Sequence, residues 1–230
     1  MMYRALLGAA ALAIGGCGLV DSDVTNFDIS LPQKTLTVDT AQWQLTSEAN
    51  FPAVDCSGNE QVCAATQGDF CGSDDCAASC DGSNCQLTIA IDLFKDFDLA
   101  SENPALQDLD DMALISVSID KIFFQVSANT LNIDTPPMGV YIAPMTVMSP
   151  SDDGAIRFGE IPAVVAGTTL AEAELILDED GEQTVQSFLE DWSTPFNIIV
   201  AADVVVAAGD PVPTGALDAA VRVNATAGID

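Results

Sequence analysis

The sequence predicts a mainly β protein: an antiparallel β-sandwich or barrel that carries one short amphipathic helix and a disulfide-rich insertion. Three observations lead to this fold class. Apolar residues alternate with polar ones in many short segments, which is the period of a half-buried strand. Clusters of Asn, Asp, Gly and Pro separate these segments. Six of the seven cysteines fall between residues 56 and 85.

The alternating segments run from residue 27 towards the C-terminus and predict a single β-domain over residues 27–230. Between Ile119 and Ile122 the apolar positions change parity, which predicts a turn or bulge at Asp120-Lys121. The apolar residues of the expected strands are Phe27, Ile29 and Leu31; Leu36 and Val38; Trp43 and Leu45; Leu87, Ile89, Ile91 and Leu93; Ile115, Val117 and Ile119; Ile122, Phe124 and Val126; Leu131 and Ile133; Val140 and Ile142; Leu175 and Leu177; Ile198 and Val200; Val204 and Val206; and Val221 and Val223.

Two segments have the period of a helix instead. Residues 182–192 place Val185, Phe188, Leu189 and Trp192 at i, i+3, i+4 and i+7, which makes one apolar stripe. A helix of this length is marginal alone in water, so we expect its stripe to lie on the sheets or at an open end of the sandwich. Residues 103–112 predict a further one or two helical turns.

The segment from residue 56 to residue 85 differs from the rest because it is rich in Cys, Gly, Asp, Ser and Asn and poor in large apolar residues. Such a segment cannot bury a core of its own, so disulfides are expected to hold it. Six cysteines allow fifteen pairings, and the spacing does not choose among them. The expected disulfide cysteines are Cys56, Cys63, Cys71, Cys76, Cys80 and Cys85.

The first residues have the layout of a secretory signal peptide over residues 1–16: one cation, Arg4, then an apolar run, then small residues. The run is too short to span a bilayer. The quartet Ile14-Gly15-Gly16-Cys17 resembles the lipobox of bacterial lipoproteins. The resemblance implies that the Cys17 thiol carries a diacylglyceryl group and that the signal peptide is cut just before Cys17.

The odd cysteine count supports this interpretation, because without Cys17 the other six can pair completely. Two or three acyl chains anchor a protein firmly without a transmembrane helix. Residues 17–26 then form a lipidated tether. By resemblance to lipoprotein sorting, Gly18 at the second mature position implies a bacterial outer-membrane lipoprotein that faces the periplasm or the cell surface.

The charge limits the partners. The chain has 35 acidic and 6 basic residues, a formal net charge of −29, so it lacks the Lys and Arg clusters that bind nucleic acid. Anionic headgroups would repel the folded body, which leaves the lipid as the membrane contact. The chain is nevertheless 49% hydrophobic, as a folded domain requires. A protein partner in the envelope is not identified by the sequence.

The sequence offers little catalytic chemistry. It has no histidine, which excludes Ser-His-Asp and Cys-His catalysis. Ser118-Ile119-Asp120-Lys121 matches the S-x-x-K of penicillin-binding proteins, but its alternating flanks favour a strand, where Ser and Lys would not share a face. Acidic turns at Asp152, Asp153, Asp178 and Asp180 are expected to be solvated, and the alternative is a weak calcium site. No other cofactor is expected.

These observations favour a non-catalytic, membrane-anchored lipoprotein with a structural, adhesion or assembly role in the cell envelope. The alternative is a β-sandwich module that binds calcium or a partner through its acidic loops. A carboxylate-based hydrolase is the third hypothesis, and the least favoured because only carboxylates, hydroxyls and few lysines are present.

Overall fold

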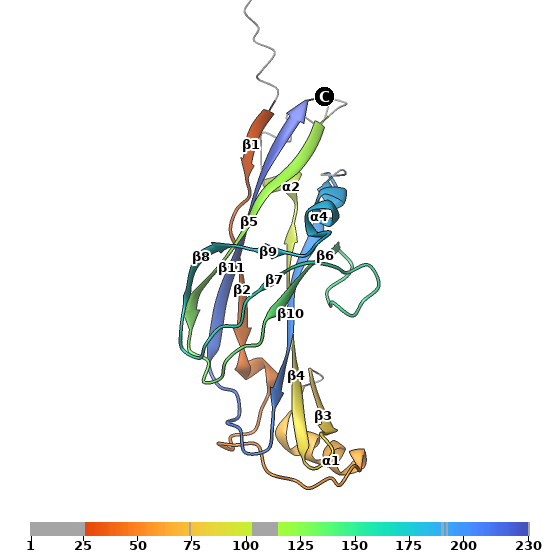
Figure 1. Ribbon diagram of the computed structural model, residues 1–230, viewed down its shortest axis with the longest axis vertical. Helices are drawn as coiled ribbons and strands as arrows, with labels where there is room; N and C mark the ends of the chain where they lie inside the picture. The colour runs from red at the N-terminus through yellow and green to blue at the C-terminus, as the bar shows by residue number, and fades with distance from the viewer. Residues whose placement is uncertain (1–25, 74, 103–114, 190, 192, 230) are drawn as a thin grey trace, which may run out of the picture.

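The computed structural model describes residues 26–73, 75–102, 115–189, 191 and 193–229. It shows an elongated sandwich of two antiparallel sheets (Figure 1), which confirms the predicted fold class. The elements in chain order are β1 (Asn26–Ser30), β2 (Lys34–Asp39), the 3-10 helix η1 (Thr40–Trp43), α1 (Glu60–Phe70), β3 (Cys76–Cys80), β4 (Cys85–Phe97), α2 (Leu99–Glu102), β5 (Ile115–Asn129), β6 (Met138–Pro144), β7 (Ile156–Ile161), β8 (Leu170–Glu174), β9 (Ile176–Leu177), α4 (Gly181–Leu189), β10 (Phe196–Val206) and β11 (Ala216–Ile229).

One sheet has the order β1-β11-β5-β8, and β2 also pairs with β11. Because β2 pairs with Ala216–Val221 and β1 with Asn224–Gly228, these two short strands follow one another along β11. The other sheet has six strands in the order β3-β4-β10-β6-β7-β9. The alternating apolar residues meet between the sheets in one buried cluster, to which all long strands contribute.

The parity switch in β5 corresponds to a β-bulge. Lys121 pairs with Asn224 and Ile119 pairs with Ala225, so Asp120 is an extra residue in the ladder. A bulge of one residue returns the apolar side chains that follow it to the core face. The predicted irregularity is therefore confirmed, and the two expected strands on either side of it are one continuous strand.

Two expected strands are absent from the described residues. Trp43 belongs to the 3-10 helix η1, because the Asp39 carboxylate accepts the N–H of Ala41 and Gln44 takes a left-handed conformation. Leu45 contributes only an isolated bridge. The prediction of a strand here was wrong because a local cap, which alternation does not reveal, redirects the chain.

The segment with Leu131 and Ile133 is likewise a loop, so the strand predicted there was wrong. The Asn129 side chain accepts the N–H of Leu131, and the Asn132 side chain bonds the backbone of Val212 and Thr214. The backbone N–H groups of Thr130 and Asn132 still bond the carbonyls of Ala216 and Thr214, but the side-chain amides take up other backbone groups and the segment forms no regular strand.

The structure also contains elements that the sequence does not predict. In β7, Gly159 pairs with Val140 and Arg157 pairs with Tyr141, so Phe158 is bulged and the apolar pattern loses its period of two. Strand β8 has mostly exposed residues, which give no core signal. Helix α1 lies in the cysteine-rich segment and is described with the candidate site.

Helix α4 confirms the amphipathic helix predicted near residue 182. Val185 and Leu189 are buried, and the helix contacts β5 and β7. Phe188 is only half-buried, so the full burial expected of the stripe is not reached there. Trp192 and the helix expected over residues 103–112 lie outside the described residues.

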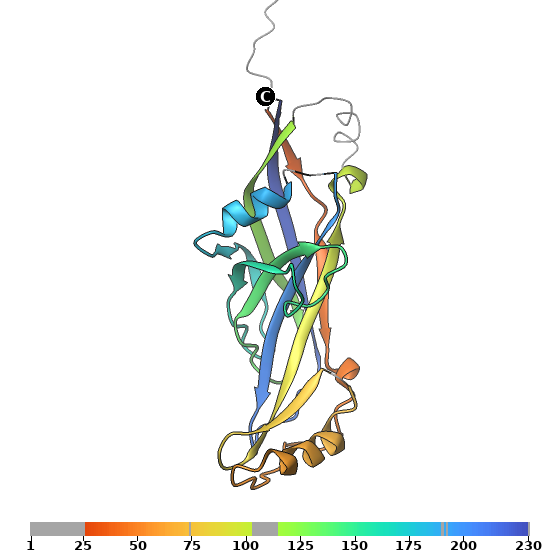
Figure 2. The ribbon, with the colours of Figure 1, turned by 90° about the vertical axis from the view of Figure 1, so that its right-hand side faces the viewer.

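The two ends of the long axis differ. Strand β1 and the C-terminal end of β11 lie at one end, whereas α1 and β3 lie at the other, and a view turned by 90° agrees (Figure 2). The part of the chain that the structure describes holds no helix long and apolar enough to cross a membrane.

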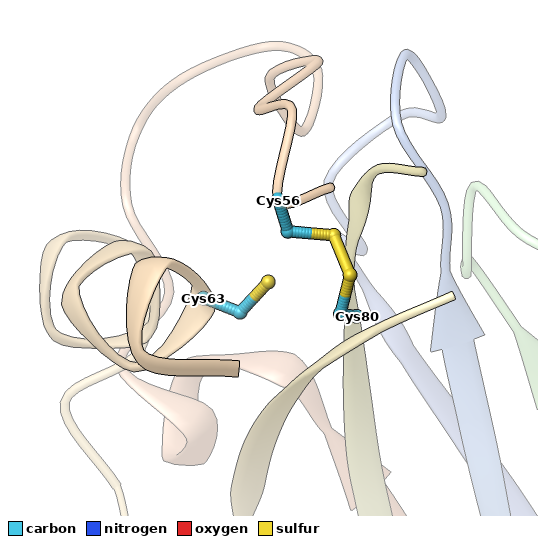
Figure 3. A group of neighbouring side chains, drawn as sticks. All are labelled: Cys56, Cys63 and Cys80. Atoms are coloured by element: carbon cyan, nitrogen blue, oxygen red, sulfur yellow. A yellow bond between two sulfur atoms is a disulfide. The ribbon is translucent and has the colours of Figure 1, made fainter. Parts of the chain in front are cut away.

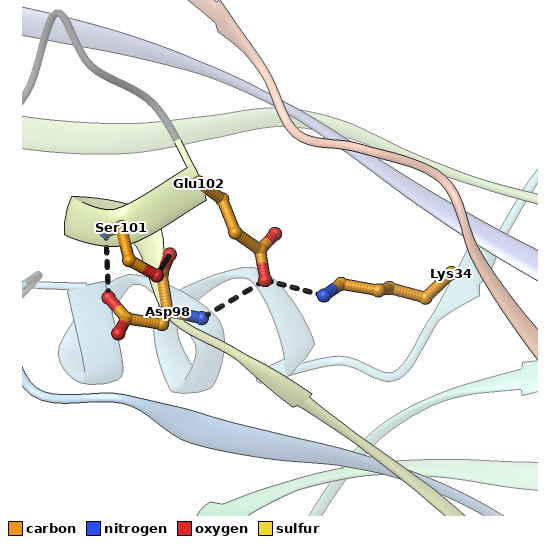
Figure 4. Close-up of polar contacts among 4 residues, drawn as sticks. All are labelled: Lys34, Asp98, Ser101 and Glu102. Atoms are coloured by element: carbon orange, nitrogen blue, oxygen red, sulfur yellow. Dashed lines mark hydrogen bonds and ion pairs between the residues drawn. The ribbon is translucent and has the colours of Figure 1, made fainter.

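An ion pair joins the sheets near the β1 end. Lys34 Nζ lies 2.5 Å from Glu102 Oε1 and sits over the Phe97 ring. Asp98 and Glu102 form a capping pair around α2 (Figure 4): the Asp98 carboxylate accepts the N–H of Ser101, and Glu102 Oε1 accepts the N–H of Asp98. The contact fixes the start of β2 against the end of β4.

Candidate functional site: the disulfide-braced tip

Residues 56–85, which we call the tip, hold all six cysteines that the sequence predicts to pair. They form three disulfides: Cys56–Cys80, Cys63–Cys85 and Cys71–Cys76. The paired Cα atoms lie 6.0, 5.3 and 6.3 Å apart, respectively, within the range of ordinary disulfides. Five of the six cysteines are buried and join the main core cluster, so the tip packs on the sandwich and forms no separate core.

Helix α1 begins at Glu60 because Asn59 caps it: the Asn59 side chain accepts the N–H of Gln61 at 3.1 Å. Its two buried residues are Cys63 and Thr66. A helix without a broad apolar stripe has little tendency to pack by itself. The Cys63–Cys85 disulfide therefore attaches α1 to β4.

Side chains of α1 take the place of a neighbouring strand along the outer edge of β3. Gln67 Nε2 donates to Cys76 O at 2.8 Å, and Gln67 Oε1 accepts the N–H of Ala78 at 3.1 Å. Glu60 Oε2 accepts the N–H of Cys80 at 2.9 Å. Alternate residues of a strand direct their backbone groups to the same edge, so these bonds satisfy that edge and prevent another strand from pairing there.

At the tip the six-stranded sheet is reduced to three strands, which we call the tip sheet. Ile89 of β4 pairs with Cys76 on one side and with Val204 of β10 on the other. Leu87 likewise pairs with Ala78 and with Val206. The tip sheet thus has β4 in its centre, β3 at one edge and the last residues of β10 at the other.

The sulfurs of Cys56, Cys63 and Cys80 form a compact group, with all three atoms within 4.8 Å of one another (Figure 3). Thiolates at this separation can ligate zinc. Here Cys56 and Cys80 are bonded to each other, and Cys63 is bonded to Cys85. The group is therefore two adjacent disulfides: one ties the segment before α1 to β3, and the other ties α1 to β4.

The structure places the acidic residues considered for calcium in two separate turns. Asp152 and Asp153 lie in the turn between β6 and β7, and Asp178 and Asp180 lie between β9 and α4. Asp178 Oδ2 is 3.7 Å from Arg157 Nε. Within the described ranges, no three of these four carboxylates come within 4.8 Å of one another. Calcium binding here stays a prediction from the sequence.

The remaining sequence candidates are dispersed. Ser118 Oγ donates to the carbonyl of Thr226 at 3.4 Å, whereas Lys121 Nζ pairs with Glu174 at 2.8 Å. These two residues of the S-x-x-K match have different partners and form no nucleophile–base pair. Cys17 lies outside the described residues.

Two aspartates have a lowered pKa, each in a turn. The N–H groups of Asn84 and Ser83 donate to Asp81 at 2.8 and 2.9 Å, and these bonds lower the pKa of Asp81 because they favour the charged form. The hydroxyls of Thr194 and Ser193 lower the pKa of Asp191 in the same way. Both carboxylates are exposed and close turns, which is a structural role.

Sequence reasoning missed α1, β3 and the tip sheet, although it located the cysteines.

No family model and no curated protein matches this chain. A solved structure from work on carbohydrate-binding modules of the β-sandwich superfamily is similar at 11% identity and a TM-score of 0.26. The match covers 86% of this chain but 54% of that chain, so this chain spans about half its length. A TM-score this low carries no argument about fold or function.

Proposed function

We propose that this chain is a non-catalytic, membrane-anchored lipoprotein of the bacterial cell envelope that holds its disulfide-braced tip away from the membrane for adhesion or assembly. One observation carries the proposal: β1, which follows the candidate lipidation residue Cys17, begins at the end of the molecule opposite to α1 and β3 (Figure 1). A lipid at Cys17 would place the sandwich between the membrane and the tip.

The chemistry of the chain supports this role. The sequence contains no histidine, and the cysteines of the tip are engaged in disulfides. Disulfides persist in an oxidising compartment such as the periplasm or the cell surface. The net charge of −29 would keep the folded body off anionic headgroups and so favours an upright arrangement.

The anchor is tested by mass spectrometry of the mature protein from the membrane fraction. We expect an N-terminus at Cys17 with the mass of attached acyl chains, and we expect Cys17→Ser to remain unprocessed or soluble. The matched control is Gly18→Asp, which should keep the lipid and change only the membrane in which the protein is found. A mature N-terminus elsewhere, or one without lipid, would refute the anchor.

The orientation is tested separately by neutron reflectometry of the lipidated protein on a supported bilayer. We expect a protein layer about as thick as the long axis of the sandwich, with the tip farthest from the lipid. A layer as thin as the short axis would mean that the sandwich lies flat, and the proposed display of the tip would then be wrong.

A further inference from the structure

Half of β10 has an open edge. Strand β10 pairs with β4 along its whole length, but with β6 only from Phe196↔Pro144 to Ala201↔Gly139. If the register with β6 continued, the next residues opposite β10 would be Met138, Pro137 and Pro136. Proline has no N–H group and cannot continue a ladder. Among the described residues, Ala202–Val206 therefore has no strand partner on this side.

The chain before β6 leaves a groove beside this edge. Thr135 turns away and bonds Val164, with its N–H 2.9 Å from the Val164 carbonyl. Two adjoining cavities of about 330 and 370 Å³ lie between residues 132–136 and the end of β10, and both are lined by Asp134, Val204 and Val205. An extended segment added beside β10 would run along this groove.

The open edge lies one strand away from the disulfide-braced part of the sheet. Val204 and Val206 pair through β4 with Cys76 and Ala78 of β3, and the three disulfides fix β3, β4 and α1 to one another. An edge held in its strand conformation before binding costs little ordering free energy when a partner strand is added.

The chemistry of the groove selects a cationic segment. Asp134 lines both cavities, Asp210 lines the first and Asp203 the second, and Val205 beside them is 53% exposed. The side-chain carboxylate of Asp203 has no hydrogen-bond or ion-pair partner among the described residues. The cations with an acidic partner in the structure are all elsewhere: Lys34, Lys121, Arg157 and Arg222.

We propose that Ala202–Val206 binds an extended segment of a partner protein as an added β-strand, and that this segment alternates basic with apolar residues. Backbone hydrogen bonds to β10 would supply affinity, and side chains on alternate positions would contact Asp203 and Val205. Basic residues would be attracted by Asp134, Asp203 and Asp210, and the negative net charge would accelerate encounter. The proposal rests on the assembly role given above. It does not depend on the lipid anchor, which is tested separately by the mass of the N-terminus at Cys17, so either proposal can fail without the other.

The first test uses a fluorescent hexapeptide of alternating lysine and valine and the full chain in non-ionic detergent, with binding followed by anisotropy. Two further peptides carry N-methyl groups on the lysines or on the valines. Only one set of amides can face β10, so we expect one methylated peptide to bind like the parent and the other to lose at least tenfold in affinity. Equal binding by both would show that no strand is added and would overturn the proposal.

The second test locates the binding edge by charge reversal. Asp203→Lys should weaken binding of the parent peptide by about tenfold or more. Asp96→Lys is the matched control, because Asp96 is exposed and lies on β4 opposite Asn197, roughly 20 Å along the sheet from Asp203. It changes the net charge equally and should alter binding less than twofold. Equal effects of both substitutions would indicate attraction by net charge alone and refute the site.

Sedimentation decides between a foreign segment and a second copy of this chain. We expect a monomer in detergent whose sedimentation does not change with Val205→Lys. A dimer that dissociates on Val205→Lys would show that a second copy occupies the edge, and the proposal of a cationic partner would then be wrong.

Discussion

The two edges of the tip sheet differ in how they are protected. On β3, the Gln67 amide and the Glu60 carboxylate bond the backbone of Cys76, Ala78 and Cys80. On β10, Pro136 and Pro137 interrupt the neighbouring strand, and nothing in the described part of the chain replaces it. Exposed edges promote unwanted pairing, so proteins usually cover them. With the β3 edge covered, the end of β10 is the edge of the tip sheet that stays open to the strand we propose.

The largest expected effect comes from detaching the cover of the β3 edge. The double substitution Cys63→Ala and Cys85→Ala removes a bridge of sequence separation 22, for which the chain-entropy estimate is about 3 kcal/mol. Helix α1 would lose its covalent attachment to β4 and would be held on that side only by half-buried contacts such as those of Val62 and Phe70. We expect urea denaturation to show this loss and hydrogen exchange at the Ala78 amide to accelerate.

The control for this substitution is the pair Cys71→Ala and Cys76→Ala. Its sequence separation is only 5, so the same estimate gives about 2 kcal/mol. Both pairs join the neighbourhood of α1 to a strand, which makes the comparison direct. A greater loss from the short bridge than from the long one would show that α1 is held mainly at its C-terminal end.

A smaller effect is expected from Gln67→Ala, which removes the two hydrogen bonds to β3 and leaves the disulfides intact. Such bonds contribute on the order of 1 kcal/mol each, and the freed Cys76 carbonyl and Ala78 N–H would gain water as partners. We expect a loss of about 1–2 kcal/mol in the free energy of unfolding, measured in urea.

Gln61→Ala is the matched control for this test. Gln61 is the same residue type on the same helix, and its side chain is exposed. A substitution there should change stability by less than about 0.5 kcal/mol. Equal effects would mean that Gln67 acts through helix propensity, and the described cover of the β3 edge would then not be a source of stability.

The sequence predicted the sandwich because a half-buried strand must alternate. It also predicted the irregularity at Asp120, because a bulge changes the parity of every residue that follows. Trp43-Leu45 and Leu131-Ile133 also alternate, yet the side chains of Asp39 and Asn129 hydrogen-bond the backbone locally. Such caps depend on geometry that a pattern of apolar residues does not contain.

The tip shows a second limit of prediction. The six cysteines were identified by the composition of residues 56–85 and by the odd count, but fifteen pairings were open, and only the fold brings Cys63 to Cys85. Helix α1 has only a narrow apolar side, because its fully buried residues are Cys63 and Thr66 and its larger apolar residues, Val62 and Phe70, are half-buried. The Pro136-Pro137 pair stands in the sequence just before β6. Its consequence was not predictable, because the partner strand β10 begins at Phe196, far along the chain.

The smallest expected effect concerns the turn that joins β3 to β4, where Asp81 accepts the N–H groups of Ser83 and Asn84. These bonds lower the pKa of Asp81, so the carboxylate stabilises the folded turn at pH values above its pKa when unfolded. That contribution is lost as the pH falls through the lower pKa of the folded state.

NMR titration should show the Ser83 and Asn84 amide signals moving together, with a midpoint below that of an ordinary aspartate. Asp81→Asn keeps an acceptor oxygen and should abolish this titration while leaving β3 paired with β4. Should both amides titrate unchanged in Asp81→Asn, the carboxylate would not be the group that holds the turn, and the covered edge would depend on α1 and the disulfides alone.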